Sequence, residues 1–423
     1  MTSSTTPSAV ADTPAESLSN LFDNWLDPIE TAVRARAREF IQALIEDELE
    51  TALARPRYAR RPKADAAQAD APGVVGHRHG HRTRSLTGSF GQVELEVPRA
   101  RLAGPDGKTS EWHSQVLPAY QRRTQAVDAM IAGAYLAGTN TRRVRRALGA
   151  LFGGAIGKDV VSRVWRKVQA DWQGWNTRSL REEPIVRLIL DGTVVRVRLD
   201  RKATSISLLV VIGVRCDGQK VLLAIRSMGG ESAEAWRAVL DDLIQRGLRR
   251  PQFLIVDGAP GLEKAIAAVW DGVPVQRCTV HKLRNLLAHA PERLRDEVAA
   301  DYNVIMYAAS RDEILQRRKA FLRKWRLKHW AVANSLEEAG DRLFTFTALP
   351  PMQWRSARTT NAIERLHEEF KRRIKTQTVL PSAETAAMLF WSLLASGQIT
   401  MRKVDGWQTL ALNLIDQPID LAA

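Results

Sequence analysis

The stretch that decides the fold is residues 187–198, which read RLILDGTVVRVR. Its residues are mostly apolar and β-branched apart from an Asp-Gly pair and arginines, and this composition predicts a long strand. Residues 205–214 and 221–226 are two further apolar segments, so a three-stranded meander is expected. Beyond them follow, in alternation, a helix (231–246), an apolar strand that ends in an aspartate (253–257), a helix (260–270), a short strand (273–276) and a helix from about residue 280. This order predicts a mixed α/β sheet with helices on both faces.

Two of these strands carry an aspartate, Asp191 and Asp257, each directly before a glycine. Either one alone is typical of a turn residue. Two carboxylates after apolar runs on neighbouring central strands have a second interpretation, because a buried carboxylate needs a metal ion or hydrogen-bond donors. The pair therefore predicts a carboxylate site at one edge of the sheet.

A third acid would complete a site for hard divalent cations, which prefer carboxylate oxygens. A helix predicted from about 360 to 375 offers Glu364 and, one turn later on the same face, Glu368. Asn361 could cap this helix and leave Glu364 as a capping residue. Composition and spacing do not choose between these alternatives.

The charge is the most informative part of the composition. The 423 residues carry 62 basic and 47 acidic side chains, a net charge of +15, which favours a polyanionic partner such as nucleic acid. Residues 1–50 hold 3 basic and 10 acidic side chains, whereas residues 51–170 hold 21 basic and 8 acidic. A solvated basic face is the alternative, but the concentration of charge makes residues 51–170 the first place to expect DNA contacts.

Residues 121–169 predict three helices, the last two joined by the glycine-rich turn 153–157, a pattern typical of a helix-turn-helix. A generic three-helix bundle is the alternative. The density of basic residues favours DNA contact, with one helix in the major groove and its neighbour on the phosphates. The candidate DNA-binding residues here are Arg142, Arg143, Arg145, Arg146, Lys158, Arg163, Arg166 and Lys167.

The composition also excludes some classes of protein. No apolar run is long enough for a membrane-spanning helix, and the N-terminus lacks the basic and apolar regions of a secretory signal. Only two cysteines, Cys216 and Cys278, are present, which excludes a disulfide scaffold and fits a reducing cytoplasm. We therefore expect a cytoplasmic, nucleoid-associated protein with no membrane partner.

These features divide the chain as follows: 1–20 disordered; 21–120 an N-terminal helix, a basic linker over 54–85 and a small β element around 91–98; 121–175 the helix-turn-helix domain; 184–288 the first part of the α/β domain; 289–355 an all-helical insertion; and 356–423 the final helices. The insertion offers Leu294, Val298, Ile305, Phe321, Trp325 and Trp330 as core candidates. Trp325 or Trp330 could instead stack on a flipped base, although aromatic residues at helical spacing are more often core.

The ordered motifs resemble those of prokaryotic Mutator-type insertion-sequence transposases, a family with a DDE active site in a ribonuclease-H-like catalytic domain. They are Leu190-Asp-Gly192, Ile255-Val-Asp-Gly258, Arg277-Cys-Thr-Val-His-Lys-Leu-Arg-Asn285 and Thr359-Thr-Asn-Ala-Ile-Glu-Arg365, and the similarity covers roughly residues 25–410. The chain departs from the pattern at His367, where relatives usually carry Asn. The resemblance implies that Asp191, Asp257 and Glu364 are the catalytic, metal-binding acids, with the 107-residue gap before Glu364 filled by a helical insertion.

The resemblance further implies DNA cleavage and strand transfer with two Mg²⁺ ions, for which Mn²⁺ can substitute. Water would nick a transposon end, and the freed 3′-hydroxyl would attack target DNA. The partners would be double-stranded DNA, as terminal inverted repeats and target, and a second copy of the chain in a homodimer or larger assembly. Basic and polar residues around Glu364 would contact phosphates: Arg358, Asn361, Arg365, Lys371, Arg372 and Arg373.

Three alternatives remain at this point. Cys278 and His281 match a Cys-x-x-His pair of the family, and with no second cysteine pair a packing or hydrogen-bonding role is favoured over zinc. The chain could be a non-catalytic DNA-binding protein with a degenerate nuclease fold, which the complete set of acids argues against. It could also be a structure-selective nuclease without strand transfer, which only a joining assay distinguishes.

Overall fold

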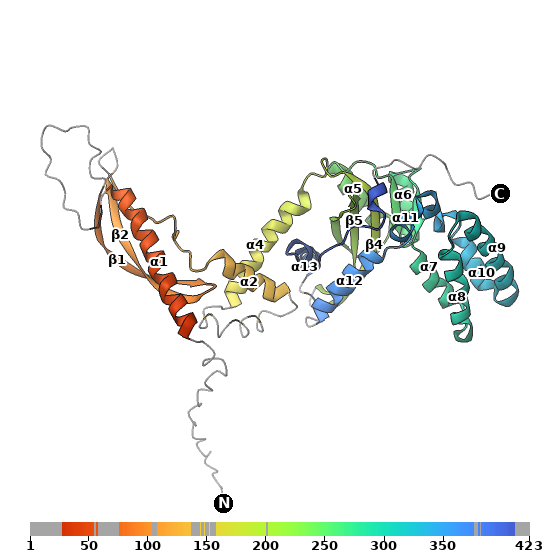
Figure 1. The fold of residues 1–423 in the computed structure, drawn as a ribbon, viewed down its shortest axis with the longest axis horizontal. Coiled ribbons are helices and arrows are strands. Elements are labelled where there is room, and N and C mark those ends of the chain that lie inside the picture. Colours follow the sequence, from red (N-terminus) through yellow and green to blue (C-terminus); the bar gives the residue numbers. More distant parts are fainter. Residues whose placement is uncertain are drawn as a thin grey trace, which may run out of the picture. The chain divides into compact units, whose positions relative to one another are not determined.

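The computed structural model describes residues 28–54, 56–57, 76–103, 108–136, 144, 148, 152, 158–199, 202–375, 380 and 382–410. The chain forms two compact units, Met1–Tyr135 with Thr139–Trp165, and Leu136–Gly138 with Arg166–Ala423 (Figure 1). The predicted disorder of residues 1–20 lies outside the described residues.

In the first unit, helix α1 (Pro28–Leu53) packs on a three-stranded antiparallel sheet of β1 (Gly76–Gly88), β2 (Gly91–Ala103) and β3 (Thr109–Glu111). Alternate residues of β2 are buried, as its period-2 pattern predicts. The prediction of a basic linker up to residue 85 is wrong over 76–85, which belong to β1 and pair with β2. The side chains in that part of β1 are partly or fully exposed. The strand therefore needs no apolar residues there, and its sequence lacks the alternation that would have predicted it.

The remainder of the first unit holds α2 (Gln125–Leu136) and the start of α4 (Lys158–Thr177). Valines of α4 and apolar residues of α2 share one buried cluster with Val144 and Phe152. The predicted middle helix (141–151) lies outside the described residues apart from single positions, so the helix-turn-helix remains a prediction.

The second unit is built on a five-stranded sheet in the order β6-β5-β4-β7-β8. The meander of β4 (Ile185–Leu199), β5 (Lys202–Arg215) and β6 (Lys220–Met228) is antiparallel, and β7 (Phe253–Val256) and β8 (Val275–Arg277) continue it in parallel with β4. Helices α5 (Ala233–Gln245) and α6 (Pro260–Val269) bury Leu188 and Leu190 on one face. Helices α12 (Asn361–Ile374) and α13 (Ala383–Ala395) contact β4. The predicted mixed α/β class is therefore confirmed.

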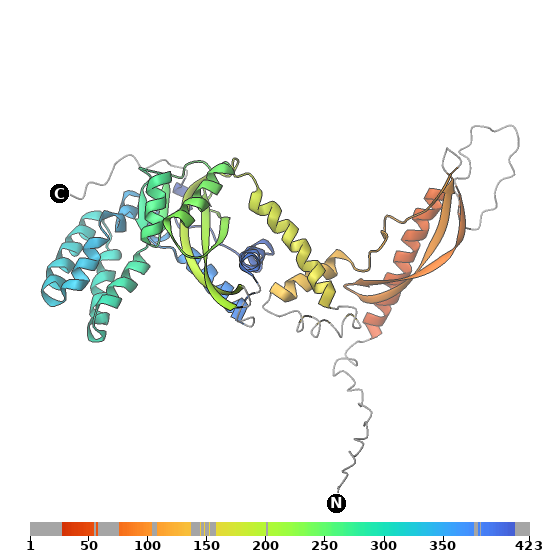
Figure 2. The ribbon, with the colours of Figure 1, turned by 180° about the vertical axis from the view of Figure 1, so that it is seen from behind.

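Residues 289–355 contain helices and no strand. Helix α7 (Thr279–His289) leads into α8 (Arg295–Met306), α9 (Arg311–Lys328) and α10 (Trp330–Glu338), which lie side by side in both views (Figures 1 and 2), and α11 (Pro351–Ala357) returns to the sheet. Short 3₁₀ turns lie at Glu292–Leu294, Asp341–Leu343, Thr345–Ala348 and Trp407–Thr409. Of the helices in the described part of the chain, none combines the length and apolarity needed to cross a bilayer.

Within this helical segment the predicted core is mostly correct. Val298, Ile305, Phe321 and Trp325 are buried, and Leu294 is partly buried. Trp330 is wrong as a core residue, since it is 67% exposed at the start of α10. Its exposure leaves the base-stacking hypothesis open for Trp330 alone. The fully buried Trp325 donates its indole N–H to Asp301 Oδ2 (2.9 Å) and cannot stack on a base.

Candidate active site

Two carboxylates meet where the parallel pair β4 and β7 runs side by side. Leu190 pairs with Val256, so the next residues, Asp191 and Asp257, lie at the same level of the sheet. Asp191 is only 4% exposed. Its Oδ1 accepts a hydrogen bond from the Gly192 N–H, and Asp257 Oδ1 accepts one from the Ala259 N–H, both at 2.9 Å. Neither Oδ2 accepts a hydrogen bond from the described residues, so each carboxylate keeps one oxygen for another ligand.

Glu364 comes to this point from α12. Its carboxylate, that of Asp191 and a ring nitrogen of His281 all lie within 4.8 Å of one another. The burial of Ile363, Leu366 and Phe370 fixes the rotation of α12 about its axis. Glu368 is exposed, so the structure brings Glu364, and not Glu368, to Asp191.

The capping interpretation of Glu364 is wrong. Helix α12 begins at Asn361, and the residue before it, Thr360, makes no capping hydrogen bond with its side chain. The Glu364 carboxylate instead accepts two hydrogen bonds from Arg284, from Nη1 to Oε1 (2.9 Å) and from Nη2 to Oε2 (3.1 Å). Both of its oxygens are thus occupied by one guanidinium in a bidentate pair.

Sequence reasoning overlooked Arg284 as a site residue. It lies one helical turn after His281 on α7, so the two side chains share a face of that helix. The signal was present as an i, i+3 pair of basic residues following Asp257. It identifies a cation near the acids, but it could not show that Glu364 was its partner.

Cys278 and His281 form a hydrogen-bonded connection between α7 and the start of α12. The Thr360 N–H donates to Cys278 Sγ (3.3 Å), and Thr360 Oγ1 lies 3.4 Å from His281 Nδ1. The other ring nitrogen, Nε2, lies 3.4 Å from Glu364 Oε1. A hydrogen bond with Cys278 outweighs burial and raises the pKa of His281 to about 9, with help from the charges of Cys278, Asp191 and Glu364. The raised pKa favours the protonated form of His281, whose Nε2 faces the Glu364 carboxylate.

The electrostatics of Asp191 follow from its position. Burial raises the pKa of this carboxyl to about 7, the charges of Asp257 and Glu364 add to the effect, and His281 and the Gly192 N–H oppose it. Shared carboxylate sites behave in this way because like charges resist simultaneous ionisation. A bound cation would remove that repulsion.

A fourth acid, Glu231, was also missed. It follows β6 in the segment Gly229-Gly230-Glu231, and burial together with Asp257 raises the pKa of its carboxyl. A Cβ placed on Gly192 would lie 2.3 Å from Glu231 Oε1, so the absence of a side chain beside Asp191 makes room for this carboxylate. Its position just after the end of β6, comparable to that of Asp257 after β7, was the available signal.

The predicted DNA-binding residues have different surroundings. Arg163, Arg166 and Lys167 are exposed on α4, which begins at Lys158. Near Glu364, Asn361, Arg365 and Lys371 are exposed, whereas three arginines have partners within the protein: Arg358 with the Met306 carbonyl, Arg372 with Glu369 and Arg373 with Gln398. Arg142, Arg143, Arg145 and Arg146 lie outside the described residues.

His367, the departure from the family pattern, is buried at the edge of the Phe390 ring, with ring centroids 5.9 Å apart. Burial, together with the charges of Lys371 and His281, lowers its pKa to about 3. The imidazole is therefore neutral at physiological pH and adds no charge to the acidic site.

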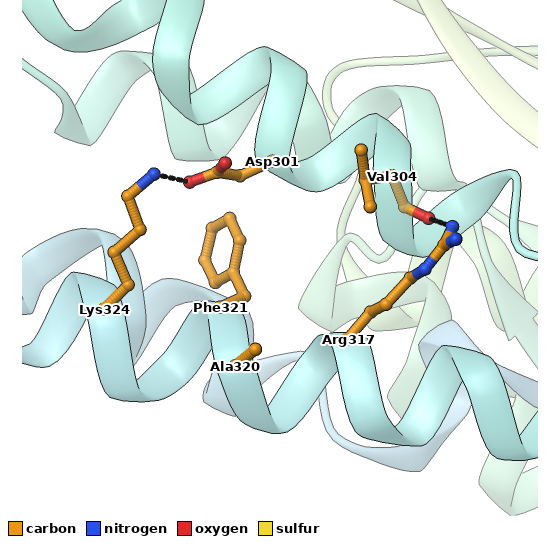
Figure 3. Close-up of a pocket in the computed structure, with 6 residues that line it drawn as sticks. All are labelled: Asp301, Val304, Arg317, Ala320, Phe321 and Lys324. Atoms are coloured by element: carbon orange, nitrogen blue, oxygen red, sulfur yellow. Dashed lines mark hydrogen bonds and ion pairs between the residues drawn. The ribbon is translucent and has the colours of Figure 1, made fainter.

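A small hollow between α8 and α9 is separate from these acids (Figure 3). Its volume is about 150 Å³. Its charged groups are satisfied within the protein, because Lys324 Nζ pairs with Asp301 Oδ2 (2.6 Å) and Arg317 donates to the Val304 carbonyl. The contacts indicate a crevice between packed helices and no reactive site.

Comparisons with known proteins agree with this geometry. Residues 15–401 match the protein family described as "Transposase, Mutator family". The chain is 30% identical over 361 residues to the transposase for insertion sequence element ISRM5 of Rhizobium meliloti, covering 85% of this chain and 86% of that protein. It is 30% identical over 329 residues to the transposase for IS256 in transposon Tn4001 of Staphylococcus aureus, covering 75% of this chain and 80% of that protein. It is 29% identical over 307 residues to the IS905 transposase of Lactococcus lactis, covering 73% of this chain and 76% of that protein. The chain belongs to the Mutator family of transposases.

Membership of this family defines the general class of chemistry. Transposases cut and transfer DNA, and they generally use divalent metal ions. Among the residues that the structure describes, the one cluster of three or more side chains able to hold a metal ion is that of Asp191, His281 and Glu364. DNA is accordingly the expected partner.

Proposed function

We propose that this protein is the DNA transposase of an insertion sequence that binds the terminal repeats, nicks the transposon ends by metal-dependent hydrolysis and joins the 3′-hydroxyl ends to target DNA. The observation that carries the proposal is the meeting of three acids from distant parts of the chain. Asp191 and Asp257 lie on adjacent strands, and α12 returns Glu364 to them across the helical segment.

The donor set suits Mg²⁺. Carboxylate oxygens are the ligands that hard divalent cations prefer, and Asp191 and Asp257 each have an oxygen without an internal hydrogen bond in the described part of the chain. In this proposal Asp191, Asp257 and Glu364 hold the ions. Two Mg²⁺ ions, or Mn²⁺ in their place, would activate the attacking hydroxyl and stabilise the leaving oxygen.

The residues of the chain would perform the remaining tasks. Cys278 and His281 orient Glu364 through α7, and Glu231 adds negative charge beside the aspartates. Arg284, which is 58% exposed, can exchange the Glu364 carboxylate for a DNA phosphate, since arginine binds both in the same bidentate geometry. The sheet order, with Asp257 directly after β7 and Asp191 beside it within β4, supports a ribonuclease-H-like catalytic domain with residues 289–355 as its insertion.

End recognition is assigned to residues 121–175 as a helix-turn-helix. The exposed Arg163 of α4, which lies outside the buried cluster of valines 160, 161 and 164, is the candidate for reading a base. Because two transposon ends must be held together, we propose a homodimer or a larger assembly.

The test is a cleavage and joining assay. The full-length protein is incubated with labelled DNA carrying candidate transposon ends, with Mg²⁺, Mn²⁺ or EDTA, and 3′ nicks and joined products are separated on gels. We expect both products with either metal and neither with EDTA, and no cleavage with Asp257→Asn although this variant still binds DNA. Binding without any cleavage would support the non-catalytic alternative, and nicks without joined products would support the nuclease.

A further inference from the structure

A basic cavity of about 580 Å³ lies on the second unit, bounded by α7, α8, the first turn of α12 and the segment 402–405. Six cationic side chains line it: Lys220, Arg355, Arg358, Arg365, Arg402 and Lys403. Asp405 is the acidic residue among its lining residues. The cavity therefore concentrates positive charge in a space large enough for a nucleotide-sized group.

Most of this charge is not neutralised within the protein. Asp405 forms an ion pair with Arg355 (3.4 Å). Lys220, Arg365 and Arg402 form no ion pair with any residue in the described part of the chain. Burial lowers the pKa of Lys220 and nearby Arg365 adds to this, while Asp405 opposes it. An anion in the cavity would relieve the repulsion among these cations.

The cavity and the candidate active site share two walls. On α7, Thr279, Val280 and Leu283 line the cavity, while His281 and Arg284 face the acids. On α12, Arg365 lines the cavity, and its neighbour Glu364 belongs to the acidic cluster. The two sites therefore lie on different faces of α7 and α12, and a helix with its side chains is roughly 10–12 Å across. A DNA strand carries a phosphate about every 3.4 Å along the helix axis, so it spans this distance within a few nucleotides.

We propose that the basic cavity is a second DNA-binding site, which holds phosphates of the strand that passes the carboxylates. Lys220, Arg402 and Arg365 carry the proposal, because they line the cavity and form no ion pair in the described part of the chain. Tyr307, over whose ring the Arg358 guanidinium lies at 4.4 Å, gives the cavity an aromatic wall. This inference rests on the proposed function for its DNA ligand, but it is tested by binding and does not require cleavage.

The experiment measures the affinity of the full-length protein for a labelled duplex in EDTA at a series of salt concentrations. The test variant is the double substitution Lys220→Gln with Arg402→Gln. The matched control is Arg249→Gln with Arg323→Gln, which removes the same charge from exposed positions outside the cavity. We expect the slope of log affinity against log salt to fall by up to about 1.8 in the test variant, about 0.9 for each lost phosphate contact, and to stay unchanged in the control. Lys220→Arg with Arg402→Lys, which keeps both charges, should restore the slope and so exclude misfolding as the cause.

The outcomes separate the two proposals. If the wild-type protein binds no DNA at low salt, the proposed function fails. If it binds DNA and the test variant has the wild-type slope, only the basic cavity is refuted as a DNA site. A second arm titrates sodium pyrophosphate by calorimetry: binding that requires Lys220 and Arg402, without any effect of these residues on the DNA slope, would assign the cavity to a free anion and overturn the proposal.

Discussion

Replacement of Asp191 by Asn tests the buried carboxylate site through stability as well as activity. In the metal-free protein the pKa of this carboxyl is raised from 3.8 to about 7. The unfolded chain loses the Asp191 proton near pH 4, while the folded protein keeps it until about pH 7. Because the folded state binds more protons in this window, the stability contribution present below pH 4 is lost as the pH rises through 7.

The magnitude follows from the size of the shift. At 1.36 kcal/mol for each pKa unit, a shift of roughly 3 units corresponds to about 4 kcal/mol at full ionisation. Asn has nearly the same shape and cannot ionise, so the Asp191→Asn protein escapes this loss. We expect it to be more stable than the wild type at pH 8, by up to about 4 kcal/mol, and to gain much less at pH 4, while DNA cleavage is abolished.

The assay is urea unfolding in EDTA at several values between pH 4 and pH 8, repeated with Mg²⁺. Mg²⁺ should stabilise the wild type at pH 8 and have little effect on Asp191→Asn. The control is Asp271→Asn, at an exposed turn, whose pH dependence should match that of the wild type. The assignment of Asp191 to a shared acidic site would be refuted if wild type and Asp191→Asn showed parallel pH profiles, or if Asp191→Asn still cleaved DNA at the wild-type rate.

Three further predictions concern Glu364, Arg284 and Gly258, with Glu368→Gln and Gly174→Ala as comparison variants. Glu364→Gln should abolish cleavage and Glu368→Gln should not, in the same Mg²⁺ assay; loss of cleavage in Glu368→Gln alone would move the third acid by one helical turn. Arg284→Gln should tighten Mn²⁺ binding in calorimetry by up to about fivefold, because it removes a competing, exposed ion pair worth about 0.2–1 kcal/mol, and unchanged binding would mean that the guanidinium does not compete with metal. Gly258→Ala should destabilise the protein by at least about 1 kcal/mol in urea unfolding, because φ is +94° at this position. Gly174→Ala, with open space around the added Cβ, should instead stabilise α4 by roughly 0.5–1 kcal/mol. Equal effects of the two glycine changes would contradict this reasoning.

The sequence predicted the sheet of the second unit because its strands are apolar and separated by clear turns. Asp191 and Asp257 were recognisable because each interrupts or ends such a strand. The choice between Glu364 and Glu368 could not be made from spacing, since residues four apart share a helix face. It depends on which turn of α12 lies over Asp191, and this is set by packing of α12 against the sheet.

Other features were missed because their partners are distant in the sequence. Strand β1 is polar over most of its length and is stabilised by its pairing with β2. Its own sequence has no apolar alternation that would predict a strand. Arg284 lies 80 residues from the Glu364 carboxylate that it binds. Trp330 follows the helical spacing of core residues, yet it is exposed because it lies at the start of α10, where the chain has just left α9.

The charge balance of the site suggests that Arg284 links metal binding to DNA binding. Without metal, the guanidinium holds both oxygens of Glu364 and so occupies an oxygen that a cation would need. Binding of divalent ions by the carboxylates would turn a surplus of negative charge into a surplus of positive charge, which weakens the attraction that keeps Arg284 in place. The released guanidinium would then lie beside a centre that attracts phosphate, with the basic cavity on the other side of α7. Metal and DNA should therefore bind cooperatively, and Arg284→Gln should reduce that cooperativity even though it tightens the binding of metal alone.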